Sequence, residues 1–162
     1  MTIRALQGQL TAADYKFALV VSRYHDFVTD KLQAGAIAAI AAAGGRADDV
    51  VVLRVPGAFE IPSAARHAAE TGRFDAIVCL GCLVRGATPH FEVIANAVAH
   101  GLTSASAETG VPMSFGVLTT NSIEEAVERA QDGPSNKGWE AANAAIEMAD
   151  LVSQVARSAS AP

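Results

Sequence analysis

The sequence has no run of lysine and arginine, no apolar stretch long enough to cross a membrane, and only two cysteines. With a net charge of −5 at pH 7, the chain is not expected to bind a nucleic acid or an anionic membrane. A membrane span needs about 20 apolar residues in succession, and no segment provides them. The first 16 residues also lack the apolar core of a signal peptide, so we expect a cytoplasmic protein.

The two cysteines, Cys79 and Cys82, stand in the sequence "CLGC". This C-x-x-C spacing is found in redox pairs and in halves of metal sites. Here both residues lie within an apolar run typical of a strand, where an offset of three residues places side chains on opposite faces. We therefore expect two buried, unreactive thiols.

Apolar residues are abundant, and many of them are alanines. A chain of 162 residues suggests one domain with one core, yet 51% of the residues are hydrophobic. That fraction is high for a domain of this size, which predicts that some apolar surface is buried between subunits.

Strand-like and helix-like segments alternate along the chain. Short apolar runs predict strands at residues 15–21, 49–55, 74–84 and 112–119. Helical spacing of apolar residues follows at residues 26–45, 62–72, 88–110, from 122 onward and at 139–157. Strands that are apolar throughout favour a parallel sheet covered on both faces. The sequence thus predicts an α/β fold, a three-layer α/β/α sandwich with a four-stranded, mainly parallel sheet, in one domain (1–157) with a disordered tail (158–162).

Two of the predicted helices begin with capping signals. Thr88 precedes Pro89, which predicts Thr88 as the N-cap and Pro89 as the first helical residue. Ser122 stands three residues before Glu125, which is the spacing of a capping box.

Open parallel sheets bind ligands at the carboxyl ends of their strands, and polar or aromatic residues follow three of the predicted strands. The first loop carries Tyr24, and the second carries Phe59 and Glu60. The third reads "RGATPH" (85–90). Because these loops meet at one edge, we expect a polar pocket with aromatic walls there.

The third loop has the features of a phosphate site. Gly86 would let the backbone turn tightly, while Ala87 and Thr88 would expose N–H groups where a helix begins. A helix start offers unpaired donors and a partial positive charge, which together bind phosphate. The same Thr-Pro pattern also caps many helices that bind nothing.

His90 follows this loop, and an imidazole at that place can move protons near neutral pH. A lone histidine is often incidental, and we expect His25, His67 and His100 to be so. His90 differs from them because it lies beside the expected phosphate site.

Other catalytic motifs are absent from the sequence. It contains no P-loop, no G-x-G-x-x-G after a strand and no G-x-S-x-G elbow. The H-x-E and C-x-x-C of zinc deaminases both occur, but in reversed order and without the proline. We therefore expect no metal site.

Four segments together resemble the 6,7-dimethyl-8-ribityllumazine synthase family, in its order and at its spacing. They are "VPGAFEIP" (55–62), "RGATPHFE" (85–92), "ETGVPMSFGVLTTNSIEEAVERA" (108–130) and "NKGWEAANAAIEMA" (136–149). The resemblance implies a flavodoxin-like fold of the lumazine synthase type. It also implies a transferase of riboflavin biosynthesis that condenses 5-amino-6-(D-ribitylamino)uracil with 3,4-dihydroxy-2-butanone 4-phosphate to the lumazine, phosphate and water. The family uses no metal and no organic cofactor.

The resemblance also implies roles for single residues. His90 matches the proton-transfer histidine, and the phosphate is expected to be held by Gly86, Ala87, Thr88 and Arg129. The residues expected to hold the uracil ring and the ribityl chain are Tyr24, Ala58, Phe59, Glu60, Cys82, Leu83, Val84, Phe115 and Lys137.

The position of Phe115 bears on assembly. It stands early in the fourth predicted strand, four residues or about 13 Å from the carboxyl end. One subunit could not easily bring Phe115 and His90 to the same ligand. The family builds its sites between neighbouring subunits of a homo-oligomer, so Phe115, Arg129 and Lys137 are expected to come from the adjacent chain of a pentamer or an assembly of pentamers.

Two departures from the family pattern leave alternatives open. Tyr24 stands where the family has Phe or Trp, which predicts a changed affinity and not a loss of function. The turn "QDGPSNKG" (131–138) differs from that of icosahedral members, so pentamer, decamer and 60-subunit shell stay open. Besides the synthase, the pattern allows a flavin-binding or shell-forming homologue without turnover, or a riboflavin synthase of the archaeal type.

Overall fold

The chain folds around a four-stranded sheet in which every paired strand is parallel. The computed structural model describes residues 1–160, with strands β1 (Phe17–Ser22), β2 (Val50–Val55), β3 (Ala76–Val84) and β4 (Met113–Thr120). The spatial order is β2-β1-β3-β4, so β2 and β4 are the edges. The expectation of a mainly parallel sheet is confirmed.

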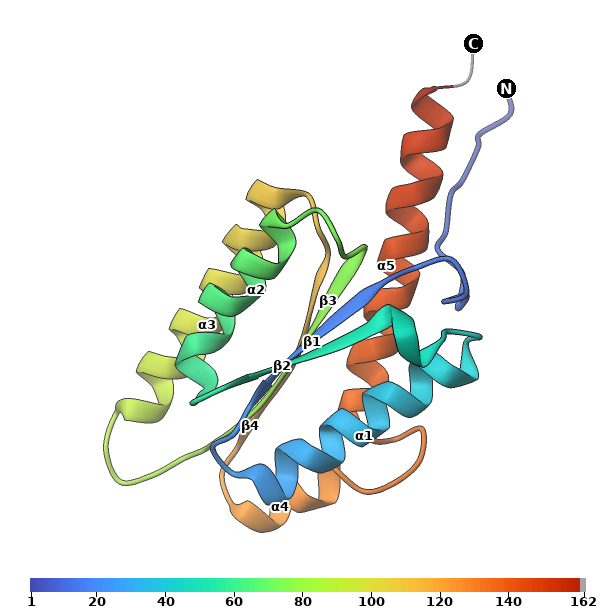
Figure 1. Cartoon of the computed structure of the whole chain (residues 1–162). Coiled ribbons are helices and arrows are strands. Elements are labelled where there is room, and N and C mark those ends of the chain that lie inside the picture. Colours follow the sequence, from blue (N-terminus) through green and yellow to red (C-terminus); the bar gives the residue numbers. More distant parts are fainter. Residues whose placement is uncertain (161–162) are drawn as a thin grey trace.

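Helices cover both faces of this sheet and make the three expected layers (Figure 1). One face carries α1 (Asp26–Ala42), the short α4 (Ile123–Arg129) and α5 (Lys137–Ala159), and the other carries α2 (Ile61–Glu70) and α3 (His90–Thr109). Two one-turn helices complete the list, η1 (Ala47–Asp49) before β2 and η2 (Ala58–Glu60) after it.

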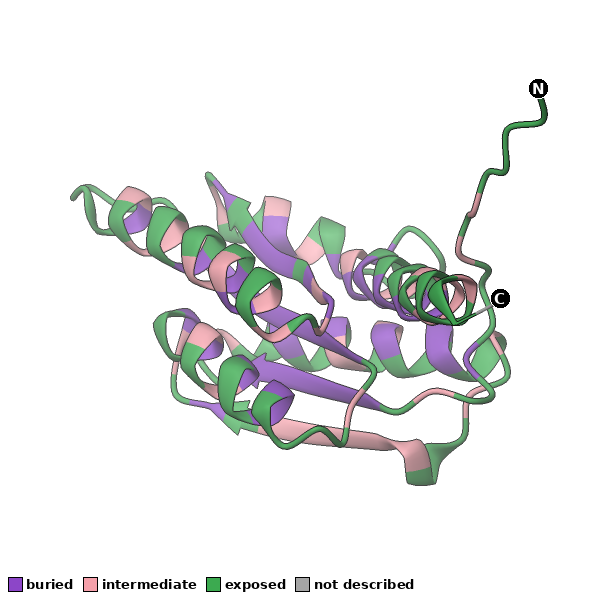
Figure 2. Cartoon of the chain, turned by 90° about the horizontal axis from the view of Figure 1, so that it is seen from above, coloured by how far each residue is buried: buried purple, intermediate pink, exposed green. Residues whose placement is uncertain are grey.

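The apolar strands divide their side chains between two cores, because successive residues of a strand point to opposite faces. Phe17 and Leu19 pack with α1 and α5, whereas Ala18 packs with α2 and α3. The same alternation separates Cys82, in the first core, from Cys79, in the second, as the sequence predicts. Figure 2 shows the buried strands enclosed between helices whose outer faces are exposed.

Two element ends differ from or refine the sequence prediction. Helix α5 continues to Ala159, two residues beyond the expected end of the domain at residue 157, and residues 161–162 of the expected tail lie outside the described residues. At the start of α4, Ser122 Oγ accepts from the Glu125 N–H at 3.2 Å, which confirms the cap. The Glu125 carboxylate accepts from the Asn121 N–H (2.9 Å), one residue before the Ser122 N–H that a capping box would use.

Helix α3 runs unbroken through Gly101, although glycine is a weak helix former. The reason lies in the packing of α3 against α2. A Cβ at Gly101 would lie 2.9 Å from the Cβ of Pro62, closer than two carbon atoms can approach. The glycine therefore lets the two helices lie side by side.

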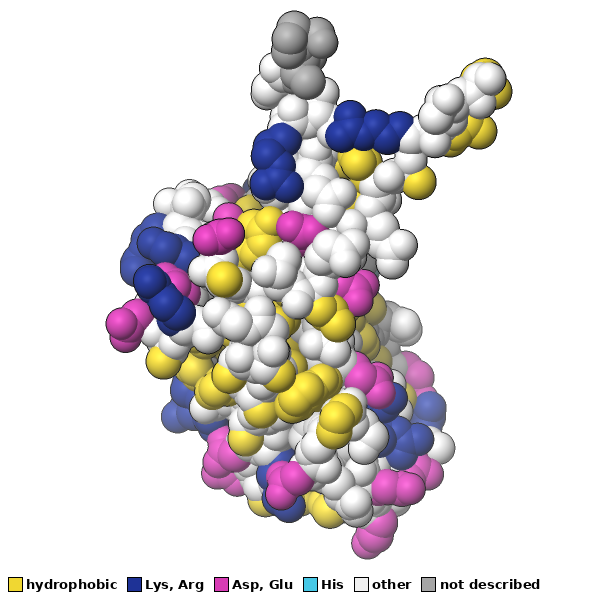
Figure 3. Space-filling model, turned by 90° about the vertical axis from the view of Figure 1, so that its right-hand side faces the viewer, with side chains coloured by type: hydrophobic (Ala, Val, Ile, Leu, Met, Phe, Trp, Pro, Cys, Tyr) yellow, Lys and Arg dark blue, Asp and Glu magenta, His cyan; other side chains and the backbone are white. Residues whose placement is uncertain are grey.

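The segment before β1 is an extended arm that runs beside α5, and both project from the body (Figures 1 and 3). The carboxylate of Asp150, on α5, holds the base of this arm. It accepts hydrogen bonds from the Tyr15 hydroxyl (2.7 Å), the Gln9 N–H (2.9 Å) and the Gln154 amide (2.7 Å). Within the described part of the chain, no helix is both long and apolar enough to span a membrane.

The Asp150 cluster predicts a pH-dependent contribution to stability. The hydrogen bonds from Tyr15, the Gln9 N–H and Gln154 lower the pKa of Asp150. A carboxyl group with a lowered folded-state pKa stabilises the fold above its ordinary pKa and loses that effect as the pH falls through the folded value. We expect Asp150→Asn to lower the free energy of unfolding by about 2 kcal/mol at neutral pH.

The difference in free energy of unfolding between the unaltered protein and Asp150→Asn should become smaller as the pH falls from about 5 to about 2, as measured by urea unfolding at each pH. Asp132→Asn, at an exposed carboxylate in the loop before α5, is the control and should show no such trend. A deficit that stays constant over this range would contradict the role given to the carboxylate.

Candidate active site

Two cavities adjoin the loops named by the sequence. The first, of about 560 Å³, lies at the carboxyl edge of the sheet and is called the edge pocket. The second, of about 410 Å³, follows the outer edge of β4 and is called the β4 pocket. The residues predicted to bind substrate are divided between them.

The edge pocket forms because β1, β2 and β3 are parallel and end together. Its walls come from the loops that follow these strands and from the first turns of α3. The predicted site residues that line it are Tyr24, Ala58, Phe59, Glu60, Cys82, Leu83, Val84, Gly86, Thr88 and His90. Tyr24 and Phe59 are both exposed there, 67% and 60% respectively, which leaves aromatic faces open to a ligand.

The start of α3 differs from its prediction. Pro89 is the N-cap and His90 the first helical residue, and no side chain caps this end, so Thr88 is not the N-cap. The Pro89 carbonyl accepts from the Val93 N–H (3.2 Å), while the N–H groups before Val93 in this turn have no helical carbonyl to bond. The exposed Thr88 hydroxyl and these donors therefore remain available to an anion.

Gly86 does not serve the tight turn expected of it. Its φ lies outside the left-handed region, and an added Cβ would meet no atom within 4 Å. The subunit's own backbone and packing therefore do not require glycine here, although Gly86 lines the edge pocket. Ala87 lies exposed in the same loop but does not line either cavity.

Arg85, which the sequence analysis did not single out, fixes the loop between β3 and α3. Its guanidinium pairs with Glu92, donates to Asn121 Oδ1 (3.0 Å) and lies 4.5 Å from the ring centre of Phe91. With its charge and donors thus engaged, Arg85 supports the first turn of α3 and does not act as a free cation. Its signal in the sequence was its place directly after a buried strand.

His25, which the sequence analysis expected to be incidental, lies at the edge pocket. Its ring lies edge-on to Tyr24, with 4.5 Å between ring centres. Its backbone is left-handed (φ 58°, ψ 49°), alone among the non-glycine residues of the described chain. Such strain in a bulky residue is characteristic of functional sites.

The thiols take no part in acid–base chemistry. Burial raises the pKa of Cys82 to about 11 and raises that of Cys79 as well. Both are therefore protonated at neutral pH, and they are free thiols on opposite faces of β3. No group of three or more His, Cys, Asp and Glu side chains that could hold a metal occurs among residues 1–160.

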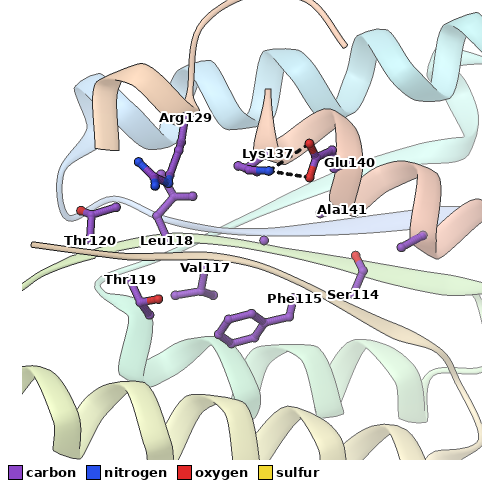
Figure 4. Close-up of a pocket in the computed structure, with 12 residues that line it drawn as sticks. Ser114, Phe115, Val117, Leu118, Thr119, Thr120, Arg129, Lys137, Glu140 and Ala141 are labelled. Atoms are coloured by element: carbon purple, nitrogen blue, oxygen red, sulfur yellow. Dashed lines mark hydrogen bonds and ion pairs between the residues drawn. The ribbon is translucent and has the colours of Figure 1, made fainter. Parts of the chain in front are cut away.

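The β4 pocket holds the other predicted site residues, Phe115, Arg129 and Lys137 (Figure 4). Arg129 and Lys137 lie on the α5 side of β4, and Phe115 points to the other side. Arg129 makes one side-chain hydrogen bond, to the Glu125 carbonyl of its own helix (3.1 Å), and no ion pair within the described chain. Lys137 Nζ donates to both carboxylate oxygens of Glu140, at 3.0 and 2.8 Å.

Strand register explains why the two sets stay apart in one subunit. Phe115 pairs with Cys79 in the middle of β3, whereas Thr120 pairs with Val84 at its carboxyl end. Phe115 and His90 therefore line different cavities. Arg129 and Phe115 of the β4 pocket flank strand β4, whose outer edge pairs with no strand within residues 1–160.

The chain was compared with known proteins. The family model of 6,7-dimethyl-8-ribityllumazine synthase matches residues 14–153. Curated relatives with that name include those of Chlorobium luteolum (51% identical; 93% of this chain and 97% of the relative), Chlorobaculum tepidum (51%; 96% and 100%) and Syntrophus aciditrophicus (50%; 92% and 97%). With half of its residues identical over almost its whole length, the chain belongs to the 6,7-dimethyl-8-ribityllumazine synthase family.

Proposed function

We propose that this protein is a transferase of riboflavin biosynthesis that forms 6,7-dimethyl-8-ribityllumazine. Its substrates would be 5-amino-6-(D-ribitylamino)uracil and 3,4-dihydroxy-2-butanone 4-phosphate, and it would release phosphate and water without a metal or an organic cofactor. The observation that carries the proposal is the match of residues 14–153 to this family, with relatives about half identical over more than nine-tenths of the chain. The edge pocket supports it, because His90 and a helix start with free N–H groups face the same hollow.

The reaction requires one group that transfers protons and one that binds the eliminated phosphate. The amine of the uracil attacks the ketone and gives an imine with loss of water. Phosphate is then eliminated, and the ribitylamino nitrogen closes the ring on the remaining carbonyl with loss of a second water. His90 would transfer the protons. Thr88, the loop at Gly86 and Ala87, and Arg129 would hold the phosphate, because N–H groups and a guanidinium are its usual partners.

The remaining edge-pocket residues would hold the other substrate. Tyr24 and Phe59 offer aromatic faces to the uracil ring and ribityl chain, and the Glu60 carboxylate can accept hydrogen bonds from ribityl hydroxyls. Ala58 and the end of β3, at Cys82, Leu83 and Val84, would supply backbone contacts. Lys137 and Phe115 would approach the same substrate from the β4 pocket of another subunit.

The division of these residues between two cavities supports a site shared by adjacent subunits. If the β4 pocket of one chain covers the edge pocket of the next, both sets meet at one ligand. Head-to-tail contacts of this kind close into rings, and we propose a pentamer or an assembly of pentamers. Exposed apolar side chains outside the two pockets, including Ile37, Val93 and Met148, are available for such contacts. We further propose that the chain forms one domain and that the protein is cytoplasmic.

Turnover tests the proposed reaction directly. Purified protein mixed with both substrates should form lumazine, followed by its absorbance, in step with released phosphate and above the uncatalysed rate. His90→Ala should lower kcat about a hundredfold with little change in substrate affinity, since general acid–base groups contribute at this level. Tight binding without turnover would place the protein among the binding or shell-forming homologues instead.

Arg129→Ala tests the phosphate contact. We expect KM for the butanone phosphate to rise at least tenfold, because a hydrogen bond to a charged group is worth about 1.5–3 kcal/mol, while KM for the uracil changes little. Arg73→Ala, at another exposed arginine outside both pockets, is the matched control and should leave both values unchanged. Equal losses for the two substrates would rule out the assignment.

Mixed assemblies test the shared site. Neither His90→Ala nor Arg129→Ala alone should be fully active, but co-expressed subunits should regain activity, because roughly a quarter of random interfaces would combine an intact His90 with an intact Arg129. His90→Ala co-expressed with the double variant is the control, since no interface then contains His90. If the first mixture gains nothing over its parents, the two residues act within one subunit.

A further inference from the structure

Arg129 and Lys137 stand at the two ends of one short junction. Arg129 is the last residue of α4 and Lys137 the first of α5. Among the described residues, each side chain bonds only within its own helix, Arg129 to the Glu125 carbonyl and Lys137 to Glu140. Their placement relative to each other and to β4 therefore depends on what holds the backbone of the junction, residues 130–136.

One buried side chain, that of Asn136, holds this junction. It is 1% exposed, and its amide nitrogen donates to the Ala130 carbonyl (3.0 Å) and to the Lys31 carbonyl of α1 (3.1 Å). Its amide oxygen accepts from the Gly138 N–H (2.8 Å) and the Trp139 N–H (3.2 Å) in the first turn of α5. A single amide thus ties the residue after Arg129, helix α1 and the start of α5 together.

The surrounding packing leaves no room for this arrangement to shift. A Cβ at Gly35 of α1 would lie 2.3 Å from Asn136 Oδ1, and a Cβ at Gly138 would lie 2.0 Å from the Leu32 carbonyl oxygen. Both glycines are therefore needed where α1 and α5 approach the amide. The Asn136 N–H also donates to the Gly133 carbonyl (3.0 Å), which closes the turn before the helix.

We propose that Asn136 is a positioning residue for the phosphate-bearing substrate, which acts by holding the carboxyl end of α4, and with it Arg129, at the β4 pocket. The inference rests on the phosphate contact proposed for Arg129. Only an amide of this size combines the two donors and the acceptor that the site uses. Serine and threonine can still cap α5, and so keep Lys137 in place, but they cannot donate to both carbonyls.

Asn136→Ser separates the two halves of this role. It keeps the cap of α5 and adds no charge, but it releases the Ala130 and Lys31 carbonyls. We expect KM for the butanone phosphate to rise about tenfold, because a misplaced guanidinium loses most of a charged hydrogen bond. The dissociation constant of inorganic phosphate, measured by calorimetry on the assembled protein, should rise by a similar factor, while KM for the uracil stays within about twofold.

Ile146→Val, at a fully buried position of the same helix, is the matched control. It destabilises α5 by about 1 kcal/mol without touching the junction, and should change neither phosphate value. Asn136→Thr fills more of the space left by the amide than Asn136→Ser does, and it replaces Asn136→Ser in the test if that variant does not fold. The urea midpoints of all variants show how far each is destabilised.

The outcomes separate this inference from the proposed function. If the unaltered protein binds inorganic phosphate but forms no lumazine, the function fails and the calorimetric comparison still decides the role of Asn136. If lumazine forms but the Asn136 variants bind phosphate as the unaltered protein does, the positioning role is wrong. Equal changes for both substrates, or the same changes in Ile146→Val, would likewise assign Asn136 to stability alone.

Discussion

The parallel pairing of all four strands is the constraint from which the rest of the structure follows. A parallel strand must be reached by a crossover, so a helix lies between each strand and the next, and helices come to cover both faces. The same constraint brings the carboxyl ends of the strands to one edge. The loops there are short and carry Tyr24, η2 and the start of α3, and the edge pocket is the space that they enclose.

Helix packing then decides how much freedom the site has. Glycines stand where α2 meets α3 and where α1 meets α5, at Gly101 and Gly138. Both pairs lie closer than an added Cβ would allow. The first turns of α3 line part of the edge pocket, and the first turns of α5 line part of the β4 pocket. Each half of the candidate site is thus attached to a rigid support, and its side chains reach outward from it to the surface.

The sequence was sufficient for the features that depend on local pattern. The apolar runs predicted the strands, the Ser122 cap was found from its spacing to Glu125, and the period of a strand placed Cys79 and Cys82 on opposite faces. The loops at the strand ends and the family resemblance together supplied the candidate site residues, and the structure divides all of them but Ala87 between two pockets.

What the sequence could not reveal depends on contacts between distant residues or on backbone angles. The amide of Asn136 reaches a carbonyl 105 residues away, and Arg85 reaches Asn121 on another loop. No sequence pattern around His25 indicates its left-handed backbone. Gly86 was expected to be a turn glycine, although its φ lies outside the left-handed region. In each case the residue type was visible but its partner or its conformation was not.

The open edge of β4 has a consequence for how the protein would respond to dilution. Phe115 and Arg129 flank a strand edge that pairs with no other strand in the described part of the chain, while His90 lies in the other cavity. If neighbours complete the site, the fraction of complete sites follows the law of mass action, and specific activity depends on protein concentration near the dissociation constant of the assembly. Substitutions along β4 would then change the protein concentration at which the assembly dissociates as well as the reaction rate, so that assembly and catalysis depend on the same few residues.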